Sequence, residues 1–386
     1  MVVVFFAMAL TFVVSLRLSQ DEAEESGRSD PQLNSEAGQR FVRKGSDSGH
    51  ENSTNTVQES SSGAGSANTV TTTKWDAEEL RAKVASANVL MRNKALEDFK
   101  KQLLILHETD PELRALQSLL REIAADDEAF APLVAASGAV GTPQVQLVLQ
   151  RLVEERNGEW RTFSAVVPVL GGLSAPSDET LQLLNRLARE GDTDFSQTAA
   201  LALGASVRGM AEVQPRRARQ ILESYIARLQ DTRADAEDLK ESLSVLGNSG
   251  LTEAAQPILV LTRHTRSDVR AEAVMALRFI RTPEVEKRLV EVFARDSETQ
   301  VRLSAVESLL HAPLHDEVLP AAQRIVGDFK NEPRLLRERA IDLIMHLELP
   351  VSAKSDLRAW LLQMAAREQD KKLKGKLVSA ANQLMP

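Results

Sequence analysis

The sequence contains no cysteine and very few aromatic residues. Its 386 residues include a single tyrosine, and aromatic residues make up 4% of the chain. Without thiols the chain can form no disulfide, no thiolate zinc site and no cysteine nucleophile. A core with so few rings is built from small and medium aliphatic side chains, and 43% of the chain is hydrophobic. Alanine and leucine dominate this fraction, and both are strong helix formers.

A surplus of basic charge and a strand pattern are also missing. The chain carries 47 basic and 55 acidic residues, which gives a net charge of −8. Because a basic face supplies most of the affinity for nucleic acid, we expect no nucleic-acid partner. No stretch shows sustained alternation of valine, isoleucine or threonine, so we expect no β-sheet.

The only long hydrophobic run is MVVVFFAMALTFVVSL, residues 1–16, which Arg17 follows. It is shorter than the roughly 20 residues that span a bilayer, and it lacks a basic leading region and a small-residue cleavage site. We predict a hydrophobic signal-anchor or signal peptide over residues 1–19, the alternative being a core helix. This prediction makes the membrane a partner and places the repeat domain outside the cytoplasm (periplasmic or extracellular), or secreted.

Residues 20–74 differ in composition from the rest of the chain. They are rich in serine, threonine and glycine, and their few apolar residues are isolated. Such a segment cannot bury enough surface to offset the entropy of ordering the chain. We predict a disordered linker over residues 20–74 that leads into a helical domain at residues 75–386.

Helical periodicity begins after Trp75 and continues to the end of the chain. An N-cap residue followed by proline marks a helix start at residues 110–111, 142–143 and 282–283. The periodic segments between such breaks are about as long as the average helix of a globular protein. The pattern predicts an all-α domain of consecutive short helices.

Internal similarity shows that these helices repeat. Two copies of one pattern, 32 residues apart, share a valine, an arginine, an alanine and a leucine. The first copy has Val269, Arg270, Ala273 and Leu277, and the second has Val301, Arg302, Ala305 and Leu309. A third copy, with Leu336, Arg337 and Ala340, follows 35 residues after the second. A helix pair cannot cover its own apolar face, so repeats of this length stack on one another. We expect the two alanines to let helices approach closely and the two leucines to fill the adjacent space.

These copies resemble the HEAT-repeat family. The run DVRAEAVMAL, residues 268–277, carries the resemblance most clearly, residues 298–309 carry it more loosely, and residues 235–348 are covered well. The resemblance implies an α-solenoid, a right-handed superhelix or horseshoe, behind the disordered N-terminal stalk.

A narrower resemblance involves the order of four segments. GTPQVQLVLQRLV, TAALALGASV, LGNSG and VRAEAVMALR, at residues 141–153, 198–207, 246–250 and 269–278, resemble the helical domain of vitellogenin-like large lipid-transfer proteins. In that family a helical horseshoe surrounds sheets that enclose lipid. The resemblance implies lipid or lipoprotein transfer as an alternative function, with lipid as the alternative partner.

Four residues are candidates for partner binding. Arginine recurs at one repeat position, which forms either a ladder facing a ligand groove or a set of bonds to carbonyls and carboxylates of neighbouring repeats. We predict partner binding, with both alternatives open, at Arg270, Glu272, Arg302 and Arg337.

No catalytic, cofactor or metal site is predicted. His311 and His315 are four residues apart, but Pro313 between them breaks the helix that would align them. Ser174 lacks the second glycine of a nucleophile elbow. We expect Trp160 and Trp360 to belong to the core, with an interface role as the alternative.

The sequence therefore predicts an all-α, HEAT-like solenoid without enzyme activity. We expect an exported or membrane-tethered scaffold or adaptor that binds another protein or peptide on the curved face of the array. Lipid handling is the alternative, and an enzyme is the least favoured class because no catalytic residues can be assembled.

Overall fold

The computed structural model describes residues 76–106, 111–125, 127–156, 158–190, 193–311 and 317–384. Contacts divide the chain into two units, residues 1–72 and 73–386, and all described residues belong to the second. The predicted signal segment at 1–19 and linker at 20–74 lie outside the described residues. The predicted boundaries of these segments stay predictions.

The described part of the chain consists of helices in two rows. One row holds the odd-numbered helices: α3 (Val89–Leu103), α5 (Phe130–Val140), α7 (Trp160–Gly171), α9 (Thr193–Val213), α11 (Ala236–Ser249), α13 (Ser267–Ala276), α15 (Thr299–Leu310), α17 (Arg334–His346) and α19 (Lys371–Gln383). The other row holds the even-numbered helices: α2 (Ala77–Val84), α4 (Pro111–Glu122), α6 (Pro143–Glu155), α8 (Asp178–Glu190), α10 (Pro215–Gln230), α12 (Ala255–Leu261), α14 (Pro283–Arg295), α16 (Val318–Gly327) and α18 (Val351–Arg367). Two short 3₁₀ helices, η1 (Thr252–Ala254) and η2 (Leu277–Phe279), lie in the turns.

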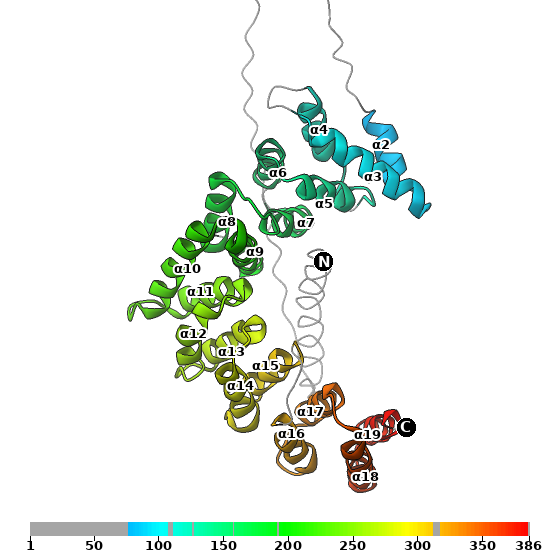
Figure 1. The fold of residues 1–386 in the computed structure, drawn as a ribbon, viewed down its shortest axis with the longest axis vertical. Coiled ribbons are helices and arrows are strands. Elements are labelled where there is room, and N and C mark those ends of the chain that lie inside the picture. Colours follow the sequence, from blue (N-terminus) through cyan, green and yellow to red (C-terminus); the bar gives the residue numbers. More distant parts are fainter. Residues whose placement is uncertain are drawn as a thin grey trace, which may run out of the picture. The chain divides into compact units, whose positions relative to one another are not determined.

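The two rows form one stack of helix pairs. Each even-numbered helix packs against the odd-numbered helix that follows it, and each odd-numbered helix packs against the next one in its row. Taken by itself, this unit follows a curved path with the odd-numbered row on the inner side (Figure 1). No strand occurs among the described residues. The predicted all-α solenoid is confirmed.

The helices begin where the sequence predicted. The side chains of Thr142 and Thr282 accept hydrogen bonds from the amides of Val145 and Val285, and proline occupies the first position of α6 and α14. These bonds satisfy backbone amides that have no partner within the helix, and the fixed φ of proline suits its first turn. Gly250 ends α11 with φ 64°, the left-handed conformation that favours glycine.

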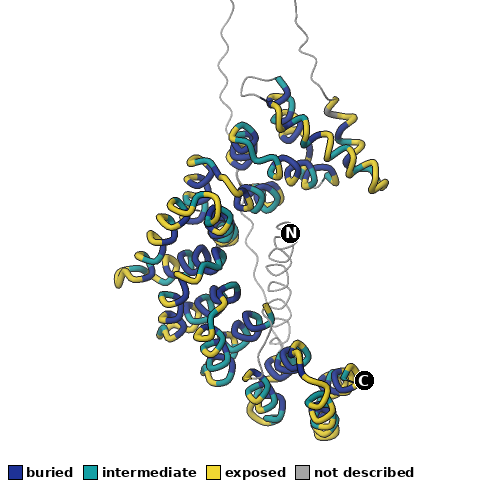
Figure 2. The backbone as a smooth tube through the Cα atoms, viewed as in Figure 1, coloured by how far each residue is buried: buried dark blue, intermediate teal, exposed yellow. Residues whose placement is uncertain are grey.

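The hydrophobic core is a continuous seam between the rows. One cluster of buried apolar residues extends from α2 to α19, and Figure 2 shows it in dark blue along the described helices. The predicted core positions belong to it: Val269, Ala273, Leu277, Val301, Ala305 and Leu309 are each at most 2% exposed. Each repeat therefore depends on its neighbours for burial, as expected of stacked helix pairs.

Glycines let the odd-numbered helices of the central repeats approach one another closely. A Cβ atom on Gly247 would lie 2.5 Å from the Cα of Ala276 in α13, and one on Gly171 would lie 2.6 Å from the Cα of Ala202 in α9. Distances below about 3 Å do not occur between real side chains and backbone, so only glycine fits at these contacts.

No helix in the described ranges is long and apolar enough to cross a membrane. The longest of them, α9, has 21 residues but carries the charges of Asp194, Arg208 and Glu212, and charges inside a bilayer are costly. This finding contradicts the predicted membrane-anchored or secreted location, which was wrong.

Candidate binding surface at the turns of the helix pairs

The recurring arginines lie near the starts of consecutive odd-numbered helices and form ion pairs across the turns. Each guanidinium reaches a carboxylate between 26 and 31 residues further along the chain. These carboxylates follow α14 or lie in the turns before α17 and α19, so each bond links two successive repeats. The three pairs are Arg270–Asp296, Arg302–Glu332 and Arg337–Glu368.

The geometry of the three pairs is that of internal bridges. Arg270 donates two bonds of 2.9 Å to the oxygens of Asp296, and Arg302 donates bonds of 2.6 and 2.8 Å to those of Glu332. Arg337, whose side chain is 5% exposed, donates to Glu368, which is equally buried. Bidentate contact with a carboxylate matches the fixed fork of a guanidinium.

Backbone carbonyls accept further hydrogen bonds from these arginines. The Nε atoms of Arg302 and Arg337 donate to the carbonyls of Phe293 and Val326, at 2.8 and 3.1 Å. Arg270 donates through Nη1 to the carbonyls of residues 264 and 265. The guanidinium groups thus bond within the array, as in the second of the two alternatives. A role in partner binding stays a prediction.

Electrostatics at the first bridge follow from this geometry. Burial alone would raise the pKa of Asp296, but hydrogen bonds from Arg270 and from the Glu298 amide, with the charge of Arg270, lower it below its ordinary value. The pKa of Arg270 is raised by its hydrogen bonds to Asp296, and also by the charges of Asp296 and Glu298. Both groups of the pair are therefore charged at neutral pH.

Glu272, the fourth predicted residue, lies away from these bridges. Its carboxylate accepts a hydrogen bond of 2.8 Å from the hydroxyl of Ser244, which joins α13 to α11. Burial raises the pKa of Glu272 above its ordinary value, although the Ser244 bond and the charge of Arg278 act in the opposite direction. Partner binding by Glu272 also stays a prediction.

A pocket of about 610 Å³ opens beside the first bridge. It is formed at the turns that follow α12 and α14, and Arg270 and Asp296 belong to its wall. The other lining residues are mostly polar or basic: Thr262, Arg263, His264, Arg288, Glu291, Val292, Arg295 and Ser297. The sequence alone did not predict this pocket, although the 32-residue spacing of Arg263 and Arg295 is a signal for it.

The opposite ends of the odd-numbered helices carry a second group of basic residues, gathered around Phe279. The guanidinium carbons of Arg208 and Arg278 lie 4.8 and 4.5 Å from the centre of its ring, and the ring of His311 packs against its edge. Arg208 donates to the carbonyls of residues 248 and 249, and Arg281 to that of His311, at the C-terminal ends of α11 and α15. Helix C-termini carry partial negative charge, so these arginines act as caps.

Burial changes the pKa values in this group. It lowers the pKa of Arg278 to about 10. Burial, together with the charges of Arg278 and Arg281, lowers the pKa of His311. Among the described residues, no group of three or more histidine, aspartate or glutamate side chains could hold a metal ion. His315, rejected from the sequence as a co-ligand of His311, lies outside the described residues.

The two tryptophans differ in burial. Trp360 is partly buried and packs against the core, as expected. Trp160, at the start of α7, is 36% exposed and forms an aromatic cluster with Phe163 and Phe195. The expectation that Trp160 is a core residue was wrong, because its ring packs on Phe163 and Phe195 while a large part of its surface stays exposed.

Comparison with known families identifies the repeat. Residues 222–310, from α10 to the end of α15, match the family model described as HEAT repeats. This part of the chain is therefore a HEAT-repeat array, as the sequence resemblance predicted, and it forms a helical scaffold. The sequence has no match among the curated proteins.

Three solved structures are similar in fold. An engineered protein is 17% identical over 79% of this chain and 87% of that chain, with a TM-score of 0.33. Human deoxyhypusine hydroxylase in complex with glycerol is 16% identical over 70% of this chain and 95% of that chain, with a TM-score of 0.29. Lipovitellin is 17% identical over 82% of this chain and 33% of that chain, with a TM-score of 0.39. At these values none of the three bears on the function of this chain.

Proposed function

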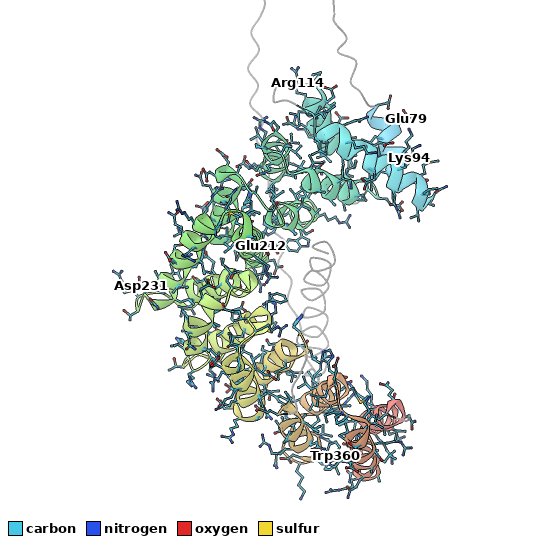
Figure 3. The ribbon with its side chains drawn as sticks, viewed as in Figure 1. Glu79, Lys94, Arg114, Glu212, Asp231 and Trp360 are labelled. Carbon is cyan, nitrogen blue, oxygen red and sulfur yellow. The ribbon has the colours of Figure 1, made fainter. Side chains whose placement is uncertain are left out.

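We propose that the helical array is a non-enzymatic protein-interaction scaffold that binds another protein or a peptide on the face of its odd-numbered row. Stacked HEAT pairs produce an extended curved surface, and proteins of this architecture use such surfaces for binding. In Figure 3, Glu212 of α9 lies on the side of this row, whereas Asp231, in the turn after α10, lies on the opposite side.

The observation that carries the proposal is a network of charged side chains that crosses α15, α17 and α19. Arg339 lies 3.5 Å from Glu307 and 3.6 Å from Asp342, and Lys376 lies 2.7 Å from Asp342. These side chains are between 26% and 42% exposed. Ion pairs with such exposure contribute little to folding, so a partner's charges can replace them at small cost. Charge complementarity of this kind selects a partner and its orientation.

The four predicted residues have an indirect part in this proposal. The guanidinium groups of Arg270, Arg302 and Arg337 hold successive repeats together, and Glu272 holds α13 to α11. We propose that they keep the binding face in shape and do not supply most of its contacts.

No observation favours lipid handling over protein binding. Large apolar side chains are exposed mainly at the N-terminal end of the array, on and after α3. Elsewhere they come from separate helices: Trp160, Val213, Val260, Leu335, Val351 and Val378. A lipid site needs a contiguous apolar surface.

Affinity capture followed by cross-linking tests the proposal. The full chain serves as bait, captured proteins are joined to it by a lysine-reactive cross-linker, and linked peptides are identified by mass spectrometry. We expect one partner to be linked mainly to lysines of the odd-numbered row. The matched lysines are Lys94, Lys240 and Lys376 in that row, and Lys83, Lys287 and Lys354 in the even-numbered row.

Two results would contradict the proposal. One is the absence of any protein retained above the level of uncoated beads. The other is a set of links confined to the even-numbered lysines. Extraction of the same preparation for lipid is the control for the alternative function, since a lipid carrier retains extractable lipid and a protein scaffold does not.

A further inference from the structure

We propose that the pocket between the turns after α12 and α14 binds anionic oxygen groups, carboxylate or phosphate, of an acidic segment in the partner polypeptide. This inference rests on the proposed scaffold function and names the chemistry of its partner. It follows from an imbalance of charge among the lining residues, which include four arginines and two carboxylates.

Two of the four arginines are already neutralised. Arg270 makes its bidentate pair with Asp296. Arg288 donates to Glu291 at 3.2 Å, and also to the hydroxyl and carbonyl oxygens of Thr262 at 2.8 and 3.0 Å. These bonds use both carboxylates of the pocket and the carbonyl of Thr262 at the end of α12.

The other two arginines, Arg263 and Arg295, are in excess. Both are exposed, and neither side chain makes a hydrogen bond or ion pair with any described residue. The pocket therefore presents two positive charges without a carboxylate to neutralise them. Guanidinium groups bind carboxylate and phosphate oxygens through two parallel hydrogen bonds, so an acidic side chain is the ligand that matches this wall.

The repeat explains why the two arginines lie at the same edge. Arg263 and Arg295 are 32 residues apart, the spacing of Arg270 and Arg302. Lys330 follows 35 residues after Arg295, the spacing of Arg302 and Arg337, and it is also exposed. Each of these three repeats thus has one exposed basic residue and one arginine that is paired with a carboxylate. An extended acidic segment would meet a positive charge at each successive repeat.

Local helix geometry does not cancel this attraction. The partial negative charge at the end of α12 would repel an anion. However, Arg288 binds the carbonyl of Thr262, and Arg270 binds the carbonyls of two further residues of the turn, His264 and Thr265. The negative helix end is therefore covered by cations, and the surplus charge belongs to Arg263 and Arg295.

Peptide binding to the purified full chain tests the inference. The probes are a fluorescently labelled peptide with four consecutive glutamates, the same peptide with glutamines, and a peptide with two phosphoserines. Fluorescence anisotropy measures their affinities. We expect the glutamate or the phosphoserine peptide to bind and the glutamine peptide not to bind, and the tighter of the two acidic peptides identifies the source of the anionic oxygens.

Substitution of the two surplus arginines locates the binding. In the double variant Arg263→Gln/Arg295→Gln we expect affinity for the acidic peptide to fall at least about tenfold, because two charge-assisted contacts are lost. The matched control is Arg216→Gln/Arg219→Gln, which removes the same charge from exposed arginines on α10 and should bind like the wild type. Circular dichroism verifies that both variants remain folded.

Two results would overturn the inference: equal binding by the pocket variant and the wild type, or an equal loss in the α10 control. If the pocket variant still captures the partner and links it through the odd-numbered lysines, the scaffold proposal stands and the pocket proposal fails. If the full chain captures no partner but the acidic peptide binds at Arg263 and Arg295, the pocket proposal stands alone.

Discussion

The central and C-terminal repeats are held together by different interactions. From α7 to α13, odd-numbered helices touch through glycine, where Gly171, Gly204 and Gly247 each face the backbone of the next helix. From α13 to α19, arginines bridge the turns to carboxylates of the following repeat. In α11, Lys240 approaches Asp268 only to 3.9 Å, so the central repeats have no equivalent strong bridge there.

Repeats of the same kind can therefore be held together either by close backbone contact at glycine or by ion pairs across the turns. Close backbone contact is independent of pH and salt and tolerates no added atom. A buried ion pair needs both charges in place, because removal of one partner leaves an uncompensated buried charge. The following predictions separate the two kinds of connection.

The largest effect is expected from breaking the most buried bridge. Arg337→Ala leaves Glu368 buried without its cation, and removal of one partner from such a pair costs about 4 kcal/mol. Hydrogen exchange should show loss of amide protection in α17 to α19 and retained protection in α7 to α13, because repeats depend on their neighbours. Arg334→Ala is the control, since its pairs are exposed and at least 3.5 Å long. Equal protection in both variants would refute a stabilising bridge.

The second effect comes from filling the closest helix contact. In Gly247→Ala the new Cβ would overlap the backbone of Ala276, and overpacking of this kind costs about 2 kcal/mol even though alanine favours helices. We expect the midpoint of urea unfolding to fall and exchange to increase in α9 to α13. A midpoint equal to that of the wild type would show that the helices can separate freely.

A glycine outside these contacts should behave in the opposite way. Gly375 lies within α19, and nothing lies within 4 Å of a Cβ built there. Gly375→Ala should raise the free energy of unfolding by about 0.5 to 1 kcal/mol, because alanine has the higher helix propensity. If Gly375→Ala instead lowers the free energy of unfolding, the destabilisation expected for Gly247→Ala cannot be assigned to its close helix contact.

The smallest effect concerns pH and the bridge at Asp296. The pKa of this carboxylate is below its ordinary value in the folded chain, so its contribution to stability is complete above about pH 4 and is lost as the pH falls further. The difference in urea midpoint between the wild type and Asp296→Asn should therefore shrink on acidification. The difference in urea midpoint between the wild type and Gly247→Ala should not change with pH. If it shrinks on acidification as much as that of Asp296→Asn, the two kinds of connection do not differ in their pH dependence.

Much of the fold could be predicted, because each local signal agrees with the others. The proline-marked starts of α6 and α14 depend on bonds between near neighbours, such as Thr142 with Val145. The repeated Val-Arg pairs depend on spacing alone. Partners such as Glu368 could not be predicted, since it is 31 residues from Arg337 and several carboxylates lie at similar separations.

The amino-acid sequence by itself determined that residues 235–348 are stacked helix pairs, because the apolar periodicity and the repeat spacing require neighbouring repeats to bury their shared face. Only the tertiary structure decided what the polar residues do. In the folded chain, Asp296 pairs with Arg270, whereas Arg263 and Arg295 pair with no carboxylate among the described residues. The charge balance of a pocket depends on which side chains meet across two turns, and no spacing along the chain contains that information.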